Sequence, residues 1–269
     1  MSGVCVRRAM HSDRVGAVDF PTLGDLVDGW IEQHCRIPDG FKRRRPFKQY
    51  DWQFWVGANH YRVREDATYD PDDPPLNQAF TYRRSEVVMA QKTGKGPMSA
   101  CYAAVMAVGP ELFAGWAKRG DVWDCADHGC PCGWYWEYEP GEPMGRRHPS
   151  PLVQVLATSQ DQVDNIWRPL TTMIRFNDSP LRNLLLPREE FIRVVGENPD
   201  DPELDRIDAV TSAALSRLGN PISAFLQDEH GTYTASNGMI KTADTMRRGA
   251  AGMGGRGMCT SNPWNPAED

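Results

Sequence analysis

The sequence has no apolar run close to the roughly 18 residues that a membrane-spanning helix needs, and no apolar segment follows Arg7 and Arg8 as it would in a secretion signal. It contains no internal repeat. Its seven cysteines, an odd number scattered over 269 residues, indicate reduced thiols and argue against a disulfide framework. A net charge of −6 gives no overall nucleic-acid signature, so any DNA contact requires a local basic patch. These absences predict a cytoplasmic protein.

The composition, 40% hydrophobic and 25% charged residues, is ordinary for a globular protein and sufficient for one large core. Short apolar segments alternate with helical patterns, which predicts an α/β fold with a mostly parallel sheet and right-handed crossovers. We expect later strands at 151–159, 190–195 and 207–212, an apolar strand in 221–230, and a last strand ending in 259–263. Helices are expected at 160–167, with Thr158 and Ser159 as candidate caps, and near 235–248, before a glycine-rich link at 249–257. The segments 66–78 and 120–150 are expected to be irregular.

The segment 85–104 begins with an apolar run, breaks at Gly94 and Lys95, and resumes as a helix of small residues. This order is typical of a strand, a phosphate-binding loop and a helix, in which backbone N–H groups face the anion and a lysine reaches the β- and γ-phosphates. The match to G-x-x-x-x-G-K-[ST] is incomplete, because Met89 takes the first glycine position and Gly96 takes that of the hydroxyl residue. Gly-Lys pairs also occur in surface turns, so the motif alone leaves both interpretations open.

A second polar site is predicted where the apolar run 221–227 ends in Asp228 and Glu229. The carboxyl ends of parallel strands meet at one edge of a sheet, where Asp228 would face a metal and phosphates and Glu229 would polarise water. An isolated Asp-Glu pair is more often a helix cap or a solvated turn. The order and separation of the two motifs favour the nucleotide site.

The aromatic-rich segment 47–55 has Gln53 near its centre. An amide can recognise the adenine edge through one donor and one acceptor, and stacked rings can cover the base. The alternative is an aromatic core cluster around a satisfied glutamine, which the local sequence alone favours.

Four potential zinc ligands, Cys125, His128, Cys130 and Cys132, lie within eight residues. Zinc motifs usually separate two ligand pairs by more residues, and a Cys-x-Cys pair forms a strained clamp. We therefore expect a metal-free surface loop, with zinc as the alternative.

Five motifs in this order resemble the N-terminal ATPase domain of tailed-bacteriophage terminase large subunits, the motors that pump DNA into a procapsid. The resemblance covers about residues 47–265 and is specific because the motifs keep the family's order. The matching positions are Gln53, 90–96 as a deviant Walker A, 156–163 as the second strand and helix, 225–230 as Walker B, and 259–262 as the coupling motif.

The resemblance implies a phosphate-loop NTPase of the additional-strand catalytic-glutamate type, with residues 1–46 as an extension and 47–269 as the ATPase domain. It implies catalytic roles for Lys95 and Glu229, and Mg²⁺ held by Asp228 through water. The nucleotide-binding residues would be Gln53, Gln91, Lys92, Thr93, Gly94, Lys95, Gly96 and Pro97. Thr260, Ser261 and Asn262 would couple hydrolysis to DNA movement, although capping and turn formation before Pro263 would also explain them.

The implied function is ATP hydrolysis that drives double-stranded DNA into the procapsid, in the cytoplasm of an infected bacterium and transiently on the portal. Implied partners are DNA, the portal protein, the small terminase subunit and further copies in a ring. Arg247, Arg248 and Arg256 flank the glycine-rich link and are candidate DNA contacts, unless they are solvated surface arginines. The alternative is a catalytically weak module with an assembly or regulatory role. A small-molecule kinase is disfavoured, because Glu229 directly after Asp228 suits water activation.

Three departures from the family pattern affect these expectations. Gly96 offers no hydroxyl to Mg²⁺, unless Ser99 replaces it. Gln91 stands where many relatives have an arginine, so the arginine that stabilises transition-state charge would come from a neighbouring subunit. The nuclease domain of relatives is expected to be absent, and with it endonuclease activity.

Overall fold

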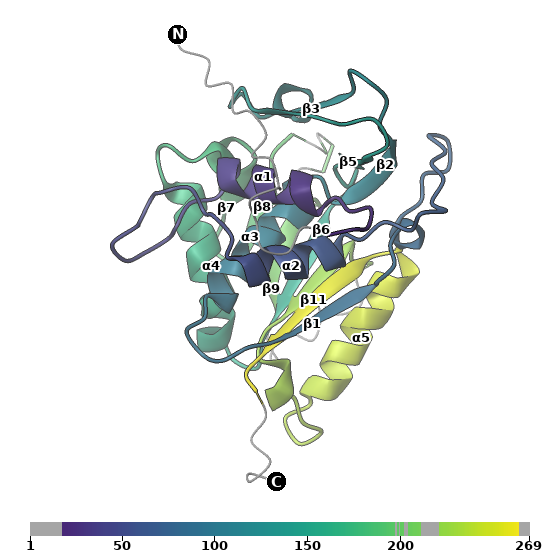
Figure 1. Ribbon diagram of the computed structural model, residues 1–269. Helices are drawn as coiled ribbons and strands as arrows, with labels where there is room; N and C mark the ends of the chain where they lie inside the picture. Colours follow the sequence, from purple (N-terminus) through teal and green to yellow (C-terminus); the bar gives the residue numbers. More distant parts are fainter. Residues whose placement is uncertain (1–17, 197, 199, 202–203, 211–220, 264–269) are drawn as a thin grey trace.

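The computed structural model describes residues 18–263, apart from 197, 199, 202–203 and 211–220, and its centre is a seven-stranded sheet (Figure 1). The strand order is β1-β11-β10-β6-β9-β8-β7. The first five strands in this order run parallel, and β8 and β7 add antiparallel pairs at one edge. The strands are β1 (Arg84–Val88), β6 (Leu152–Leu156), β7 (Leu185–Pro187), β8 (Phe191–Val194), β9 (Arg206–Val210), β10 (Ala224–Gln227) and β11 (Arg256–Ser261). The α-helices are α1 (Gly24–His34), α2 (Asp51–His60), α3 (Lys95–Val108), α4 (Gln160–Arg175) and α5 (Met239–Gly252).

Helices cover both faces of the sheet, which is why its central strands are apolar on both sides. Side chains of β10 alternate between the two faces, since successive residues of a strand point in opposite directions. Ala224 and Leu226 belong to the core cluster that also holds residues of α1, α3 and α4. Phe225 packs on the other face with Met239 and Met246 of α5. The α/β fold predicted from the sequence is confirmed.

The helix α3 lies in the middle of the larger core, and every residue from Met98 to Val108 is buried. It can be enclosed on all sides because it is built from small side chains, including Ala100, Ala103, Ala104 and Ala107. The helix therefore fixes the loop before it rigidly against the sheet.

The segment between α3 and β6, expected to be irregular over 120–150, contains two small antiparallel sheets. β2 (Leu112–Trp116) pairs with β5 (Pro143–Arg146), and β3 (Val122–Asp124) pairs with β4 (Tyr135–Glu137). Strands of three to five residues are too short to show a clear alternation, so the sequence pattern missed them. Three tryptophans of this segment, Trp123, Trp134 and Trp136, are buried in the main core.

The described part of the predicted N-terminal extension packs into the same core. Leu26, Trp30 and Ile31 of α1 are each at most 2% exposed. Residues 1–17 of that extension lie outside the described residues. A boundary at residue 46 thus does not coincide with a break in the packing.

The predicted later elements are present, although several differ in extent, and α4, predicted at 160–167, continues to Arg175. Ser159 is the cap of α4 and accepts a hydrogen bond from the Gln162 backbone N–H at 3.3 Å. β9 ends at Val210, and the last two residues of the strand predicted at 207–212 lie outside the described residues. α5 extends to Gly252, into the segment expected as a glycine-rich link, because Ala250 is buried against the sheet. Within the described ranges, no helix combines the length and the apolar character that a bilayer crossing requires.

Candidate nucleotide-binding site

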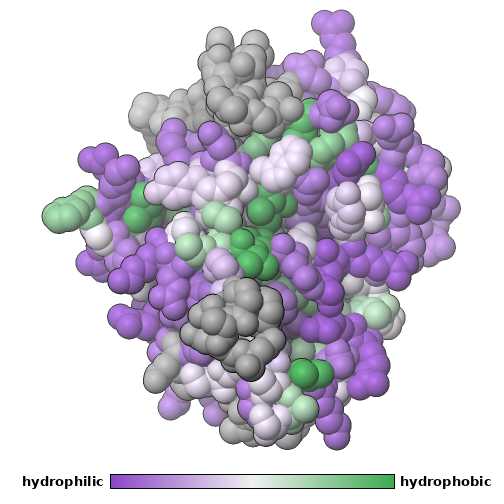
Figure 2. Space-filling view, turned by 60° about the horizontal axis from the view of Figure 1, so that its bottom comes forward, coloured by the Kyte–Doolittle hydropathy of each residue, from purple (hydrophilic) through white to green (hydrophobic). Residues whose placement is uncertain are grey.

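The carboxyl ends of β1, β11 and β10 meet at one edge of the sheet. Their register pairs Val88 with Ser261 and Gln227 with Cys259, so the residues that follow each strand come together. β11 lies between the strand before the phosphate loop and the strand before the acids, as an additional strand inserted between the two. This side of the molecule, the lower one in Figure 1, is mainly hydrophilic with small apolar patches (Figure 2).

A cavity of about 580 Å³ opens at this edge. Its lining includes the predicted residues Gln91, Lys92, Gly94, Lys95, Gly96, Pro97, Asp228, Glu229 and Asn262. Two further lining residues, Asp39 and Asn165, were not predicted. Asn165 is brought in by the packing of α4 on α3, and neither residue belongs to a motif that could have revealed it. Gln53, Thr93 and Ser99 do not line this cavity.

The ammonium group of Lys95 is folded back onto its own loop. Its Nζ donates to the carbonyls of Met89 at 2.8 Å and Ala90 at 3.1 Å, and to Oδ1 of Asn262 at 2.8 Å. The loop is held by two left-handed residues, Lys92 (φ 63°) and Gly94 (φ 95°). Lys95 is the first residue of α3, so its charge lies at a helix N-terminus, where backbone N–H groups are free to bind an anion.

Asn262 connects the lysine to the predicted catalytic acid. While its Oδ1 accepts from Lys95, its Nδ2 donates to both carboxylate oxygens of Glu229, at 3.0 and 2.9 Å. The Asn262 backbone N–H also donates to Glu229, at 3.2 Å. Glu229 itself adopts a left-handed conformation (φ 49°, ψ 41°), which is uncommon for a residue other than glycine and is typical of functional sites.

The neighbouring residues of the coupling motif hold the acids in place. Asp228 is 3% exposed, and its Oδ1 accepts a 2.6 Å hydrogen bond from the Thr260 hydroxyl. Ser261 Oγ accepts from the backbone N–H of Gly231 at 3.1 Å. The end of β11 is therefore bonded through three successive residues to the loop that follows β10.

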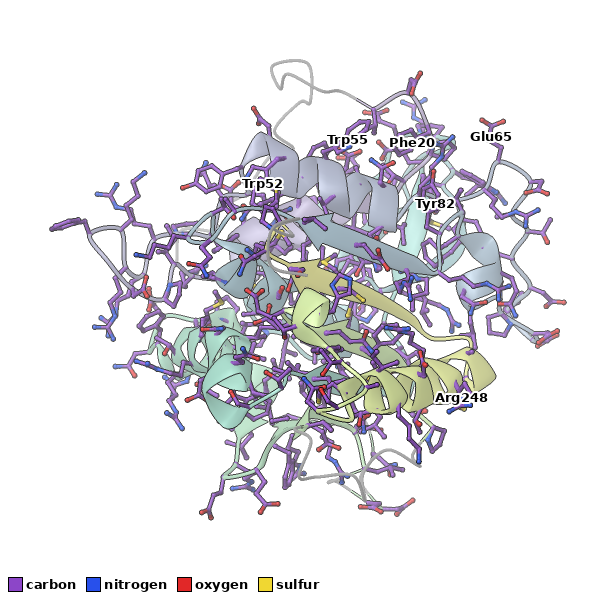
Figure 3. All side chains as sticks on the ribbon, turned by 90° about the horizontal axis from the view of Figure 1, so that it is seen from below. Phe20, Trp52, Trp55, Glu65, Tyr82 and Arg248 are labelled. Carbon is purple, nitrogen blue, oxygen red and sulfur yellow. The ribbon has the colours of Figure 1, made fainter. Side chains whose placement is uncertain are left out.

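Gln53 lies beside the phosphate loop but is engaged in helix capping. Its Oε1 accepts from the Tyr50 backbone N–H at 2.9 Å at the start of α2, and its Nε2 is 3.5 Å from the Gly94 carbonyl. Trp52 and Trp55, labelled in Figure 3, flank it on the same helix. Contact with adenine stays a prediction for this residue.

Packing explains why the loop has glycine where a hydroxyl residue was expected. A Cβ atom on Gly96 would lie 2.4 Å from the backbone oxygen of Asn165, because α4 crosses the start of α3 at this point. That distance is impossible without a shift of backbone. Any side chain at position 96 conflicts with the helix pairing.

We expect Gly96→Ser to destabilise the protein rather than to restore a metal ligand. The serine would force α3 and α4 apart, at a cost of about 1–3 kcal/mol for overpacking. Urea unfolding monitored by circular dichroism measures the change, with Gly252→Ser as a control, because no heavy atom lies within 4 Å of a Cβ there. Unchanged stability together with faster ATP turnover would contradict this expectation.

The structure separates the three arginines proposed to touch DNA. Arg256 is 1% exposed and bonded to Glu111, so its prediction as a DNA contact is wrong. Arg247 is half-buried and donates to Gln227 and Asp244. Arg248 is exposed at the far end of α5 and is the one of the three that stays available (Figure 3).

The predicted zinc ligands are also rearranged. His128 does not join the three cysteines, because its ring stacks on Trp123 with 3.8 Å between centroids. The imidazole that faces the cysteines belongs to His34 of α1.

No protein-family model matches the chain, and no curated protein matches it significantly in sequence. Several solved structures match the chain in fold. The HK97 bacteriophage large terminase matches with a TM-score of 0.55 and 16% identity over 90% of this chain and 38% of that one. The ATPase domain of the Thermus phage P74-26 large terminase matches at 0.44 and 11% over 81% and 66%. A large terminase from a thermophilic bacteriophage matches at 0.42 and 10% over 69% and 35%.

Sequence identities this low show the fold alone, and that conclusion rests on the match to the HK97 terminase. The chain spans less than two-fifths of that terminase. The predicted resemblance is confirmed at this level: over nine-tenths of its length, the chain has the fold of the matching part of a bacteriophage large terminase, with a mostly parallel α/β sheet at its centre.

Proposed function

We propose that this chain is the ATPase motor domain of a bacteriophage terminase large subunit, which hydrolyses ATP to move double-stranded DNA into a procapsid. The observation that carries the proposal is the position of Asn262. It lies at the end of the additional strand and is bonded at once to the phosphate-loop lysine and to the predicted catalytic glutamate. A bound phosphate would compete with Asn262 for Lys95. Nucleotide binding would thereby change the hydrogen bonds that Asn262 donates to Glu229.

The residues around the cavity suit nucleotide hydrolysis. Lys95 and the first N–H groups of α3 would bind the β- and γ-phosphates, and Glu229 would orient the attacking water. Asp228 fits a magnesium site, because the residue lines the cavity and Thr260 fixes one of its carboxylate oxygens. Mg²⁺ usually keeps several waters and needs few protein ligands, so a single carboxylate acting through water is sufficient. When bound, the ion neutralises charge on the β- and γ-oxygens.

A complete ATPase site also needs an arginine near the phosphates and a contact to the adenine base. No arginine is among the described residues that line the cavity, and Gln91 stands at the position of the family's arginine. We propose that a neighbouring subunit contributes the arginine when copies form a ring on the portal, together with the small terminase subunit. The adenine would reach Gln53 if the base lies over the start of α2.

A second function has a specific observation in its favour. Lys95 is held by three acceptors, and position 96 cannot carry a hydroxyl. A site of this kind would bind nucleotide weakly and serve an assembly or regulatory role in the packaging complex.

The rate of ATP hydrolysis with and without double-stranded DNA separates the two functions. For a motor, we expect hydrolysis that DNA stimulates and that Glu229→Gln lowers by about 10²- to 10⁴-fold, since the amide cannot act as a base. ATP binding should survive this substitution. If the parent protein hydrolyses ATP no faster than Glu229→Gln, with or without DNA, and still binds nucleotide measurably, the regulatory module is favoured.

DNA contact is expected to involve Arg248, which is exposed in the C-terminal half of α5 (Figure 3). Arg248→Ala should weaken DNA stimulation and its salt dependence while leaving basal hydrolysis unchanged, because contacts to backbone phosphates are electrostatic and independent of sequence. Lys241→Ala, an exposed residue of the same helix, is the matched control. Equal stimulation in the Arg248 variant and the parent would remove this contact from the proposal.

A further inference from the structure

Three cysteine sulfurs converge on one histidine nitrogen where the β3–β4 segment meets α1. The Nε2 atom of His34 lies 3.4 Å from Sγ of Cys125 and 3.6 Å from Sγ of both Cys130 and Cys132. The ligand atoms of His34, Cys130 and Cys132 all lie within 4.8 Å of one another. His34, Cys125 and Cys130 are each at most 2% exposed.

Ordinary hydrogen bonding does not account for this arrangement. A neutral imidazole nitrogen has either one hydrogen or one lone pair, so Nε2 can form one hydrogen bond and not three. A tetrahedral zinc site does account for it. Zn–S bonds of about 2.3 Å and Zn–N bonds of about 2.0–2.1 Å place ligand nitrogen and sulfur about 3.5–3.6 Å apart. The three distances observed agree with that spacing.

The histidine is oriented as a metal ligand. Its Nδ1 lies 2.9 Å from the Trp30 carbonyl, to which it can donate, and this leaves Nε2 with a lone pair directed at the sulfurs. The ring is stacked on Trp30, with 4.3 Å between centroids, and meets the edge of Trp134 at 6.0 Å. A histidine that binds zinc through one ring nitrogen usually donates a hydrogen bond from the other, often to a backbone carbonyl.

The backbone around the cysteines is shaped to present them together. Gly129 (φ 73°) and Gly133 (φ 74°) adopt left-handed conformations on either side of Cys130 and Cys132. The Cys130 N–H donates to the Cys125 carbonyl at 2.9 Å, which closes the turn between them. Glycines at the neighbouring positions therefore allow the tight turns that a Cys-x-Cys pair requires to bind one metal ion.

We propose that His34, Cys125, Cys130 and Cys132 bind one structural zinc ion. Four protein ligands close the coordination shell, which is typical of structural and not of catalytic sites. The ion would join α1 to the inserted β3–β4 segment, two parts of the chain about ninety residues apart. This reverses the expectation of a metal-free loop and replaces His128 with His34.

The first test is the metal content of the purified full chain. We expect about one zinc per chain by elemental analysis, and cobalt substitution should give the strong visible and near-ultraviolet bands of tetrahedral thiolate coordination. Removal of the metal by a chelator should lower the midpoint of thermal unfolding, and added zinc should restore it. Absence of zinc after purification and reconstitution, no shift with the chelator, or a mass 2 Da low from a disulfide among these cysteines would overturn the proposal.

The second test separates the two histidines. His34→Ala should reduce bound zinc well below one per chain, whereas His128→Ala, the matched control in the same segment, should retain it. Cys130→Ser should lose zinc, and Cys101→Ser, a buried cysteine of α3 outside the cluster, should keep it. Equal losses in the two histidine variants would contradict the assignment of His34. If His34→Ala fails to fold, the cobalt spectrum and the chelator experiment on the parent protein still decide whether the site exists.

Discussion

Lys95→Ala is expected to abolish ATP hydrolysis while the protein keeps its fold. The ammonium group at the start of α3 is bonded to both Asn262 and the loop carbonyls, and it would make the direct contact to the transferred phosphoryl group. Removal of such an electrostatic contact typically costs about 10²–10³ in turnover. A steady-state phosphate-release assay measures this loss.

The stability of the same variant is the necessary control. Lys95 donates three hydrogen bonds at the edge of the cavity, where water can take the place of the ammonium, so the loss of stability should be modest and the variant should still fold. Lys241→Ala, on the exposed side of α5, should behave as the parent in both assays. Turnover by Lys95→Ala at the parental rate would mean that this loop is not the nucleotide site.

Arg256→Met is expected to cause the largest loss of stability of any substitution considered for this chain. Arg256 is 1% exposed, lies 3.3 Å from the Glu111 carboxylate and donates to the His60 carbonyl at 2.6 Å. Its guanidinium also lies over the Phe80 ring at 3.6 Å. Without the arginine, Glu111 would be buried without its countercharge, and breaking a buried pair in this way costs about 3–5 kcal/mol.

A double variant tests this explanation. Burial already raises the pKa of Glu111, against the opposing effects of Arg256 and of the Tyr61 hydroxyl, which donates to the carboxylate at 2.5 Å. Arg256→Met combined with Glu111→Gln should therefore be more stable than Arg256→Met alone in urea unfolding. Arg248→Met, an exposed control, should change stability by less than about 0.5 kcal/mol. A similar small effect for Arg256→Met would show that the buried pair contributes little.

The sequence was sufficient to predict the loop between a strand and a helix at Gly94 and Lys95, and the main strands along the chain. These features are local: a buried strand reads as an apolar run, and the loop reads as a break at Gly94 and Lys95 before a helix of small residues. The parallel topology followed from the alternation of strands and helices. Once that topology was predicted, the meeting of Lys95, Asp228 and Asn262 at one edge followed as well, because the carboxyl ends of parallel strands share an edge.

Pairings between distant segments could not be read from the sequence. Arg256 looks like a surface residue in a glycine-rich stretch, yet the start of β11 places it against Glu111, a partner 145 residues away. Gly96 looks like a lost metal ligand, yet the crossing of α4 leaves no room for a side chain there.

The cysteine segment shows the same limit most directly. Its three thiols and the nearby His128 were visible in the sequence as potential ligands, although their close spacing favoured a metal-free loop. The fold instead turns His128 onto Trp123 and brings His34 from α1 to the sulfurs. Sequence by itself determined the local elements and the ligand types, because hydrophobic periodicity and turn chemistry act over a few residues. Only the tertiary structure decided which residues face one another, because helix packing and strand order join positions that no local pattern relates.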